Sequence, residues 1–160
     1  MVDNARDFII KIKFKIKEVY EMTSKYRTTV GWDEEETSYV RGKLVAFNSK
    51  RITNDDYERI SIILKNEESQ IVGGLLGWVE WGCFQIEVVW IDEALRGGGL
   101  GKELMQKAEQ VASEKGCHLI KLDTFSFQAP TFYQKQGFEI FGELKDFPKG
   151  YTQYYLFKRI

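Results

Sequence analysis

Cysteine, proline and histidine are scarce in this chain of 160 residues, which has two cysteines, two prolines and one histidine. One histidine and two separated cysteines offer no ligand spacing, so we expect no metal site. With so few prolines and no glycine-serine tract, the sequence predicts one domain over residues 1–160 rather than domains joined by a linker. The sequence shows no signal peptide, and its two cysteines are expected to be free thiols. Both features are typical of a cytoplasmic protein.

Long apolar runs and an excess of one charge are also absent. The longest apolar run, residues 71–79, has nine residues and includes three glycines, whereas a membrane-spanning helix needs roughly 18 apolar residues. The 23 basic residues are balanced by 24 acidic ones, and a nucleic-acid binder would gather a basic surplus on one face. The sequence therefore predicts no membrane segment and no nucleic-acid partner.

The first half of the chain carries mainly β-type patterns. Apolar residues alternate with lysines over residues 8–16, which predicts a half-buried edge strand, with a helix over the same residues as the alternative. Asp33 and the three glutamates after it predict the start of a helix that runs to about residue 49. Three β-rich stretches then predict an antiparallel meander. They cover residues 60–64, 71–79 and 84–91.

The pattern changes in the second half. An apolar stripe that begins at Leu100 and stops at Gly116 predicts an amphipathic helix, and residues 119–125 predict a strand. Strand, glycine loop, helix and strand in this order form a parallel crossover unit. A short helix and two strands complete the chain, over residues 129–136, 138–144 and 154–157. The predicted fold class is α/β, with a mixed, mostly antiparallel sheet that contains one central parallel strand pair.

A glycine loop lies between the strand that ends near Ile91 and the helix that begins at Leu100. It reads Arg-Gly-Gly-Gly-Leu-Gly from Arg96. Backbone N–H groups and the helix dipole at such a place can hold an anion such as a diphosphate. A Walker-type loop is excluded because Lys102 is followed by Glu103, and the third glycine of the dinucleotide fingerprint is missing. A glycine-rich turn that only caps the helix is the alternative.

Two motifs occur in order in this half of the chain. The first is R-x-x-G-x-G, which begins at Arg96. The second is A-x-x-hydrophobic-Y-x-x-x-G-F, carried by Ala129, Phe132, Tyr133, Gly137 and Phe138. Together they resemble the acyl-coenzyme A site of the GNAT superfamily of N-acetyltransferases, and residues 123–130 and 146–150 resemble an uncharacterised bacterial-type subgroup of it. The resemblance covers residues 33–160, and residues 1–27 are an extension or strand that it does not match.

The resemblance implies that acetyl-coenzyme A is the co-substrate and that its pantetheine lies where the two central parallel strands splay apart. The backbone of Trp90 and Ile91 would then lie beside the pantetheine, with Tyr133 near the sulfur. Ser126 stands where many family members have an asparagine that touches the cofactor, and a serine can also donate a hydrogen bond. The implied diphosphate ligands are Arg96, Gly97, Gly98, Gly99, Leu100, Gly101 and Lys102.

The resemblance also implies an N-acetyltransferase in which a primary amine of a small molecule attacks the thioester directly. Tyr133 matches the family tyrosine that protonates the departing thiolate, and a core tyrosine is the alternative. Glu87, an acidic residue in an otherwise apolar strand, is the candidate base, with Glu80 or a water molecule as substitutes. A solvated sheet face would equally explain Glu87.

Two other functions fit the same fold. One is a protein-lysine acetyltransferase, and the other is a non-catalytic domain that binds or senses acyl-coenzyme A. Dimers are common in the family, so a homodimer is a further expectation.

Overall fold

The structure is a computed structural model that describes residues 18–21, 26–52 and 57–160. Its internal contacts divide the chain into two compact units, residues 1–51 and residues 52–160. The strand predicted over residues 8–16 lies outside the described residues. Each of the two units has its own helices and strands.

The described residues of the first unit, 18–21 and 26–51, form a two-stranded antiparallel ladder and one helix. Strand β1 (Glu18–Glu21) pairs with β2 (Arg27–Val30), and helix α2 (Glu34–Asn48) follows. The Asp33 carboxylate accepts hydrogen bonds from the N–H groups of Glu35 and Glu36 at 3.1 and 3.0 Å. This cap satisfies two of the free donors at the start of the helix. It confirms that Asp33 begins the helix.

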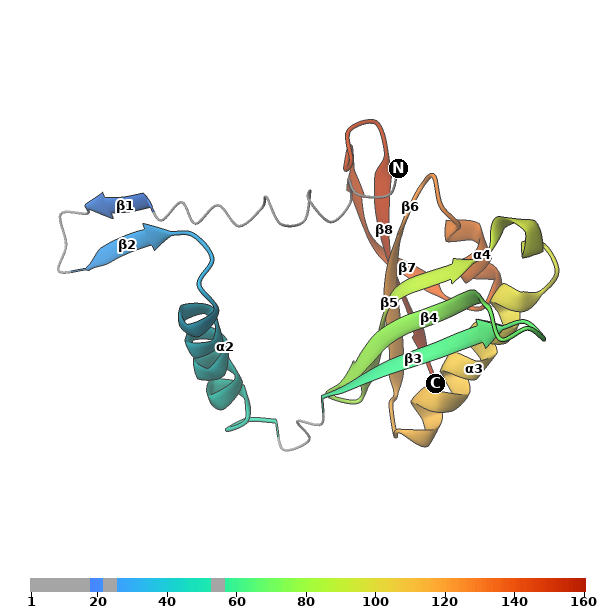
Figure 1. Cartoon of the computed structure of the whole chain (residues 1–160), viewed down its shortest axis with the longest axis horizontal. Helices are drawn as coiled ribbons and strands as arrows, with labels where there is room; N and C mark the ends of the chain where they lie inside the picture. Colours follow the sequence, from blue (N-terminus) through green and yellow to red (C-terminus); the bar gives the residue numbers. More distant parts are fainter. Residues whose placement is uncertain (1–17, 22–25, 53–56) are drawn as a thin grey trace. The chain divides into compact units, whose positions relative to one another are not determined.

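The second unit is built on a six-stranded sheet with the order β3-β4-β5-β6-β8-β7 (Figure 1). Only β5 and β6 run parallel, and every other neighbouring pair is antiparallel. The strands are β3 (Glu58–Lys65), β4 (Ile71–Glu80), β5 (Cys83–Ile91), β6 (Leu119–Phe125), β7 (Glu139–Lys145) and β8 (Thr152–Arg159). The predicted class, a mixed and mostly antiparallel sheet with one central parallel pair, is confirmed.

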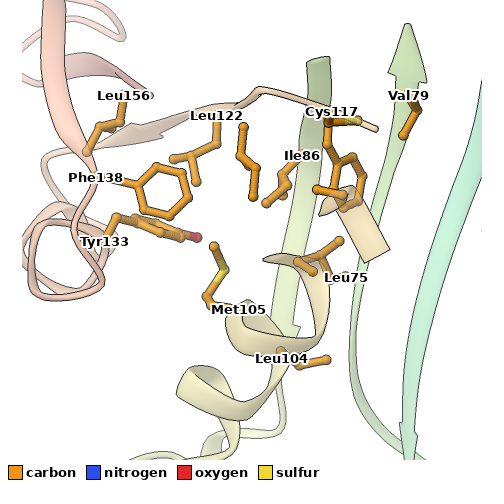
Figure 2. Close-up of a cluster of buried hydrophobic side chains, with 14 residues drawn as sticks. Leu75, Val79, Ile86, Leu104, Met105, Cys117, Leu122, Tyr133, Phe138 and Leu156 are labelled. Carbon is orange, nitrogen blue, oxygen red and sulfur yellow. The ribbon is translucent and has the colours of Figure 1, made fainter. Parts of the chain in front are cut away.

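Helices connect β5 to β6 and β6 to β7. A short 3-10 helix, η1 (Glu93–Leu95), leads into α3 (Leu100–Glu114), and α4 (Pro130–Lys135) follows β6. The apolar stripe of α3 is the face that the helix buries, with Leu104, Met105, Ala108 and Ala112 against the sheet. The core thus forms between α3 and one face of the sheet, and Figure 2 shows Met105 and Leu104 next to side chains of β4, β5 and β6.

The parallel pair β5–β6 is short. Its ladder has three residue pairs, from Cys83 opposite Leu119 to Gln85 opposite Lys121, and the two strands pair no further. The rest of β5 therefore presents an unpaired edge of backbone N–H and C=O groups toward β6. The two strands splay apart beyond Gln85.

A β-bulge interrupts the pairing of β5 with β4 at the place where β5 leaves β6. Leu76 lies opposite Val88 and Gly77 lies opposite Ile86, so that Glu87 between them has no partner on β4. The extra residue changes which side chains of β5 face the core. Ile86 is buried before the bulge, whereas after it Val88 is 41% exposed.

Candidate functional site

A cavity of about 680 Å³ occupies the gap where β5 and β6 splay apart. Its walls come from residues 86–91 of β5, Arg96, residues 122–124 of β6, residues 127–129 of the next loop, and Tyr133 of α4. The cavity therefore has one wall of unpaired strand backbone and a cation at one end. An extended, polar chain with an anionic group has the chemistry to fill it.

The glycine loop leads from this cavity into α3. Gly97 and Gly99 have φ angles of +82° and +93°, a left-handed conformation that glycine adopts without steric cost. Gly99 is the N-cap residue and no side chain caps the helix there, so backbone N–H groups of the first turn stay available to an anion. The Arg96 Nε atom donates to the Ile91 carbonyl at 3.2 Å and holds the loop against the end of β5.

Tyr133 is buried and lies in the wall of the same cavity. Its ring lies edge-on to Phe132 and Phe138, with ring centroids 5.1 and 6.2 Å away. Among the described residues none forms a hydrogen bond with its hydroxyl, and Figure 2 shows the oxygen on the side of the ring where Ile86 and Met105 lie. Burial raises the pKa of the Tyr133 hydroxyl above its ordinary value, and the Asp123 carboxylate raises it further. The hydroxyl is therefore a protonated donor at neutral pH.

Glu87 is an exposed residue and lies at the bulge, without a partner on β4. It lines the cavity between β5 and β6 and also a second cavity of about 630 Å³ over β3, β4 and β5. The carboxylate thus stands where two cavities meet. Solvation of Glu87, the alternative that the sequence left open, is what the structure shows. Glu80 lines neither of these two cavities.

The second cavity contains side chains that the sequence patterns did not single out. Arg59 on β3 donates from Nε to the Tyr57 hydroxyl at 3.4 Å. The Tyr57 hydroxyl raises the pKa of the Arg59 guanidinium, and Glu87 adds to this effect. Alternation along β3 places Arg59 on an outward face, but only the sheet register puts it near Glu87.

Five of the twelve expected site residues line one cavity in the structure, and seven do not. Glu87, Trp90, Ile91, Arg96 and Tyr133 line one cavity. The residues of the loop, Gly97, Gly98, Gly99, Leu100, Gly101 and Lys102, are beside Arg96 at the start of α3 and are not among the lining residues. Ser126 is also outside the lining, and its hydroxyl oxygen accepts from the Thr152 N–H at 3.2 Å.

Two features are absent from the residues that the structure describes. No three of their histidine, cysteine, aspartate and glutamate side chains are grouped so that they could hold a metal ion. None of the helices in the described ranges is long and apolar enough to cross a membrane.

Comparisons with known proteins agree with this geometry. The sequence model of the acetyltransferase (GNAT) family matches residues 16–138. Blasticidin-S acetyltransferase of Streptomyces morookaense is 38% identical over 95 residues, which are 59% of this chain and 70% of that protein. A crystal structure of an acetyltransferase from Bacillus cereus is 38% identical and superposes with a TM-score of 0.78, over 82% of this chain and 96% of that one.

One further similar structure holds the co-substrate. It is a Bacillus anthracis protein, described as a streptothricin acetyltransferase and solved in complex with acetyl coenzyme A. It is 28% identical, with a TM-score of 0.57, over 64% of this chain and 62% of that chain.

Proposed function

This chain belongs to the acetyltransferase (GNAT) family and is an acetyl-coenzyme A-dependent acyltransferase, and we propose that its acceptor is a primary amine of a small molecule. One observation carries the proposal. Glu87 and Tyr133, a carboxylate and a protonated hydroxyl, line one cavity between β5 and β6, and Glu87 also lines a second cavity beside it. A substrate in either cavity can therefore reach this residue.

The cavity between β5 and β6 is suited to acetyl-coenzyme A. The unpaired backbone of Trp90 and Ile91 can bond the amide groups of the pantetheine as a neighbouring strand would. The amides of the loop, with the positive end of the α3 dipole and the Arg96 guanidinium, supply the donors and the charge that a diphosphate needs. Ser126 is less directly placed, because its hydroxyl oxygen already accepts from Thr152.

The acetyl transfer needs a base, a hydrogen-bond donor for the oxyanion and an acid. Glu87, directly or through a water molecule, takes a proton from the ammonium so that the amine nitrogen can attack the thioester carbonyl. A backbone N–H near Ile91 donates to the oxyanion that develops on the carbonyl oxygen. As the C–S bond breaks, the Tyr133 hydroxyl gives its proton to the thiolate. The second proton that the attacking nitrogen loses restores the Tyr133 hydroxyl, and the products are the acetamide and free coenzyme A.

The names of two relatives support a small acceptor. Blasticidin-S acetyltransferase and the Bacillus anthracis protein described as a streptothricin acetyltransferase are both named for small molecules. The match to the first covers 59% of this chain and 70% of that protein. A small amine is therefore the acceptor class we propose here.

The test begins with a calorimetric titration of acetyl-coenzyme A into the intact protein and into a variant with Gly99 and Gly101 both replaced by valine. We expect micromolar binding by the intact protein and its loss in a still-folded variant. Release of free thiol from acetyl-coenzyme A is then measured with polyamines, aminoglycosides, amino acids and a lysine peptide. Binding without release for any small amine, or release with the peptide alone, would overturn the proposed acceptor class.

A further inference from the structure

Four aromatic side chains form one group beside the β5–β6 cavity, and they come from the end of β6, the loop after it and the β7–β8 turn. They are Phe125, Phe127, Phe147 and Tyr151, called here the aromatic rim. The rings of Phe125 and Phe127 are parallel, with centroids 5.3 Å apart. Tyr151 meets Phe127 edge-on at 4.8 Å, and Phe147 lies 6.3 Å from Phe125. Residues that are more than 20 positions apart in the chain thus build one surface.

The aromatic rim is exposed and continuous with the site. Phe127 is 55% exposed, Phe147 50% and Tyr151 48%, and none of the rim belongs to the buried core cluster. Phe127 itself lines the cavity that contains Glu87 and Tyr133. A clustered group of exposed rings at the edge of a cavity is typical of a ligand-binding surface.

Hydrogen bonds hold the loop between β6 and α4 in place. The Gln128 Oε1 atom accepts from the Thr124 hydroxyl at 3.0 Å and from the Phe125 N–H at 2.9 Å. The Gln128 N–H donates back to the Phe125 carbonyl at 2.9 Å. Because these bonds close the turn around Phe127, its ring has a defined position before any ligand arrives.

The turn between β7 and β8 is fixed in the same way and is tied to the first loop. The Asp146 carboxylate accepts from the Gly150 N–H at 2.7 Å, and the Phe147 N–H donates to the Tyr151 carbonyl at 2.9 Å. The Ser126 N–H donates to the Thr152 carbonyl at 2.8 Å and joins the two loops. Figure 1 shows the end of β6 and the β7–β8 turn at the same end of the sheet. The rim is therefore a preorganised surface.

The charged side chains that line the cavity determine which charge a ring-bearing ligand should carry. Two carboxylates, Glu87 and Asp123, line the cavity with Phe127, and Arg96 is the lining cation, beside the glycine loop. The Gln153 amide donates to Asp123 at 2.7 Å and keeps that carboxylate in place. A cationic amine close to these two carboxylates is stabilised by them, whereas the diphosphate of acetyl-coenzyme A has its cation, Arg96, beside the glycine loop.

We propose that the aromatic rim recognises a flat ring of the acceptor, so that the preferred acceptor is a small cationic amine with an aromatic or heteroaromatic ring close to the reacting nitrogen. This inference rests on the proposed function, because it names the acceptor class of that site. Phe127 and Tyr151 are its specificity-determining residues. The ring of the acceptor would pack on these two side chains while its nitrogen reaches Glu87.

Benzylamine and cyclohexylmethylamine make a matched pair of probes, because both carry a primary amine on one methylene next to a flat or a puckered ring. Benzylamine is the weaker base, so the effect of a rim variant is measured as the change in the ratio of the two amines. We expect the intact protein to favour benzylamine by about fivefold, in kcat/KM for thiol release and in the Kd measured by calorimetry with coenzyme A present. In the Phe127→Leu variant, which keeps an apolar side chain, the two amines should differ by less than about twofold. Tyr151→Leu is the second variant, for use if Phe127→Leu does not fold.

Phe141→Leu is the control. Phe141 is 61% exposed and packs with Tyr155 and Phe157 rather than with the rim, so the preference for benzylamine should persist in this variant. Equal affinity of the intact protein for both amines, no measurable affinity for either, or a preference that survives in both rim variants would overturn the inference. A binding preference that depends on Phe127, with no acetyl transfer to any amine, would support the rim and overturn the proposed function instead.

Discussion

A Cβ atom added at Gly101 would lie 3.2 Å from the Cζ atom of Phe132. Gly101 belongs to the first turn of α3 and Phe132 to α4, so this close approach brings the two sequence motifs into direct contact. A side chain at position 101 would have to push the ring of Phe132, next to Tyr133, or move the first turn of α3. The glycine loop and the tyrosine motif are therefore two parts of one packed site.

Gly101→Val should weaken binding of acetyl-coenzyme A by at least tenfold. Overpacking costs about 1–3 kcal/mol, and relief of the contact would shift the amides at the start of α3. Gly98→Ala is the control, because a Cβ there meets only the Leu95 carbonyl at an ordinary 3.5 Å. Calorimetry measures the affinity of both variants for acetyl-coenzyme A. An equal loss of affinity in the two variants would contradict the role of the contact between position 101 and Phe132.

Tyr133→Phe should lower kcat by about a hundredfold or more and leave the affinity for acetyl-coenzyme A within about twofold, because it removes only the proton donor. A loss of affinity as large as the loss of kcat would instead indicate a structural role. Circular dichroism and calorimetry control for folding and binding.

The pH dependence of kcat gives a second test of Tyr133. Burial raises the pKa of this hydroxyl above its ordinary value near 10, and the acid acts in its protonated form. The value of kcat should therefore stay constant up to about pH 10. It should fall as the pH rises further through the raised pKa of the Tyr133 hydroxyl. Tyr133→Phe should lack this alkaline fall, and an unchanged alkaline limb in the variant would assign the limb to another group.

Glu87→Gln should lower kcat by about a hundredfold, since glutamine has nearly the shape of glutamate and cannot accept the proton. Because the bulge leaves position 87 unpaired and exposed, the midpoint of thermal unfolding should stay within about 2 °C. Glu80→Gln, on the neighbouring strand and outside both cavities, should keep kcat within about twofold. If Glu80→Gln gave the larger loss, the two roles would have to be exchanged.

Lys158 on β8 is expected to stabilise the fold. Its ammonium lies 2.7 Å from the Glu109 carboxylate on α3 and 2.8 Å from the Gln136 carbonyl at the end of α4. Both side chains of the ion pair are about three-quarters buried, so Lys158→Met should cost about 1–3 kcal/mol by leaving two acceptors unsatisfied. Chemical denaturation measures this cost.

Lys145→Met is the matched control, because Lys145 pairs with Glu143 at 3.1 Å with both side chains largely exposed. An exposed pair contributes about 0–1 kcal/mol. Equal effects of the two substitutions would contradict the role of Lys158.

Much of this fold could be predicted from local patterns. The Asp33 cap marked the start of α2, and the strand predicted over residues 119–125 has the bounds of β6 in the structure. A strand, a helix and a further strand in succession implied the parallel pair. These features depend on residues that are close together in the sequence.

The features that could not be predicted depend on pairing between distant residues. Strand β8 inserts between β6 and β7, an order that no periodicity encodes. The bulge at Glu87 does not interrupt the apolar run of β5, so the sequence places this residue in a strand without showing that the strand turns it outward. The contact of Phe127 with Tyr151 joins two loops and is visible only in three dimensions.

The expected site residues came from the resemblance to a family rather than from local patterns. The structure places Glu87 and Tyr133 in one cavity, but their catalytic roles stay predictions. Arg59 and Asp123, which also line the cavities, belong to neither motif. Their positions follow from the sheet register and from the ends of the strands.

The bulge in β5 also affects which sequence changes this site can accept during evolution. Because Glu87 has no counterpart on β4, its side chain can be exchanged without disturbing any cross-strand neighbour. Deletion of the same residue would remove the bulge and leave a regular strand, in which residues 88–91 keep their inward and outward faces. Position 87 is thus free to diversify by substitution, and even its loss would leave the core-facing side chains of β5 in place.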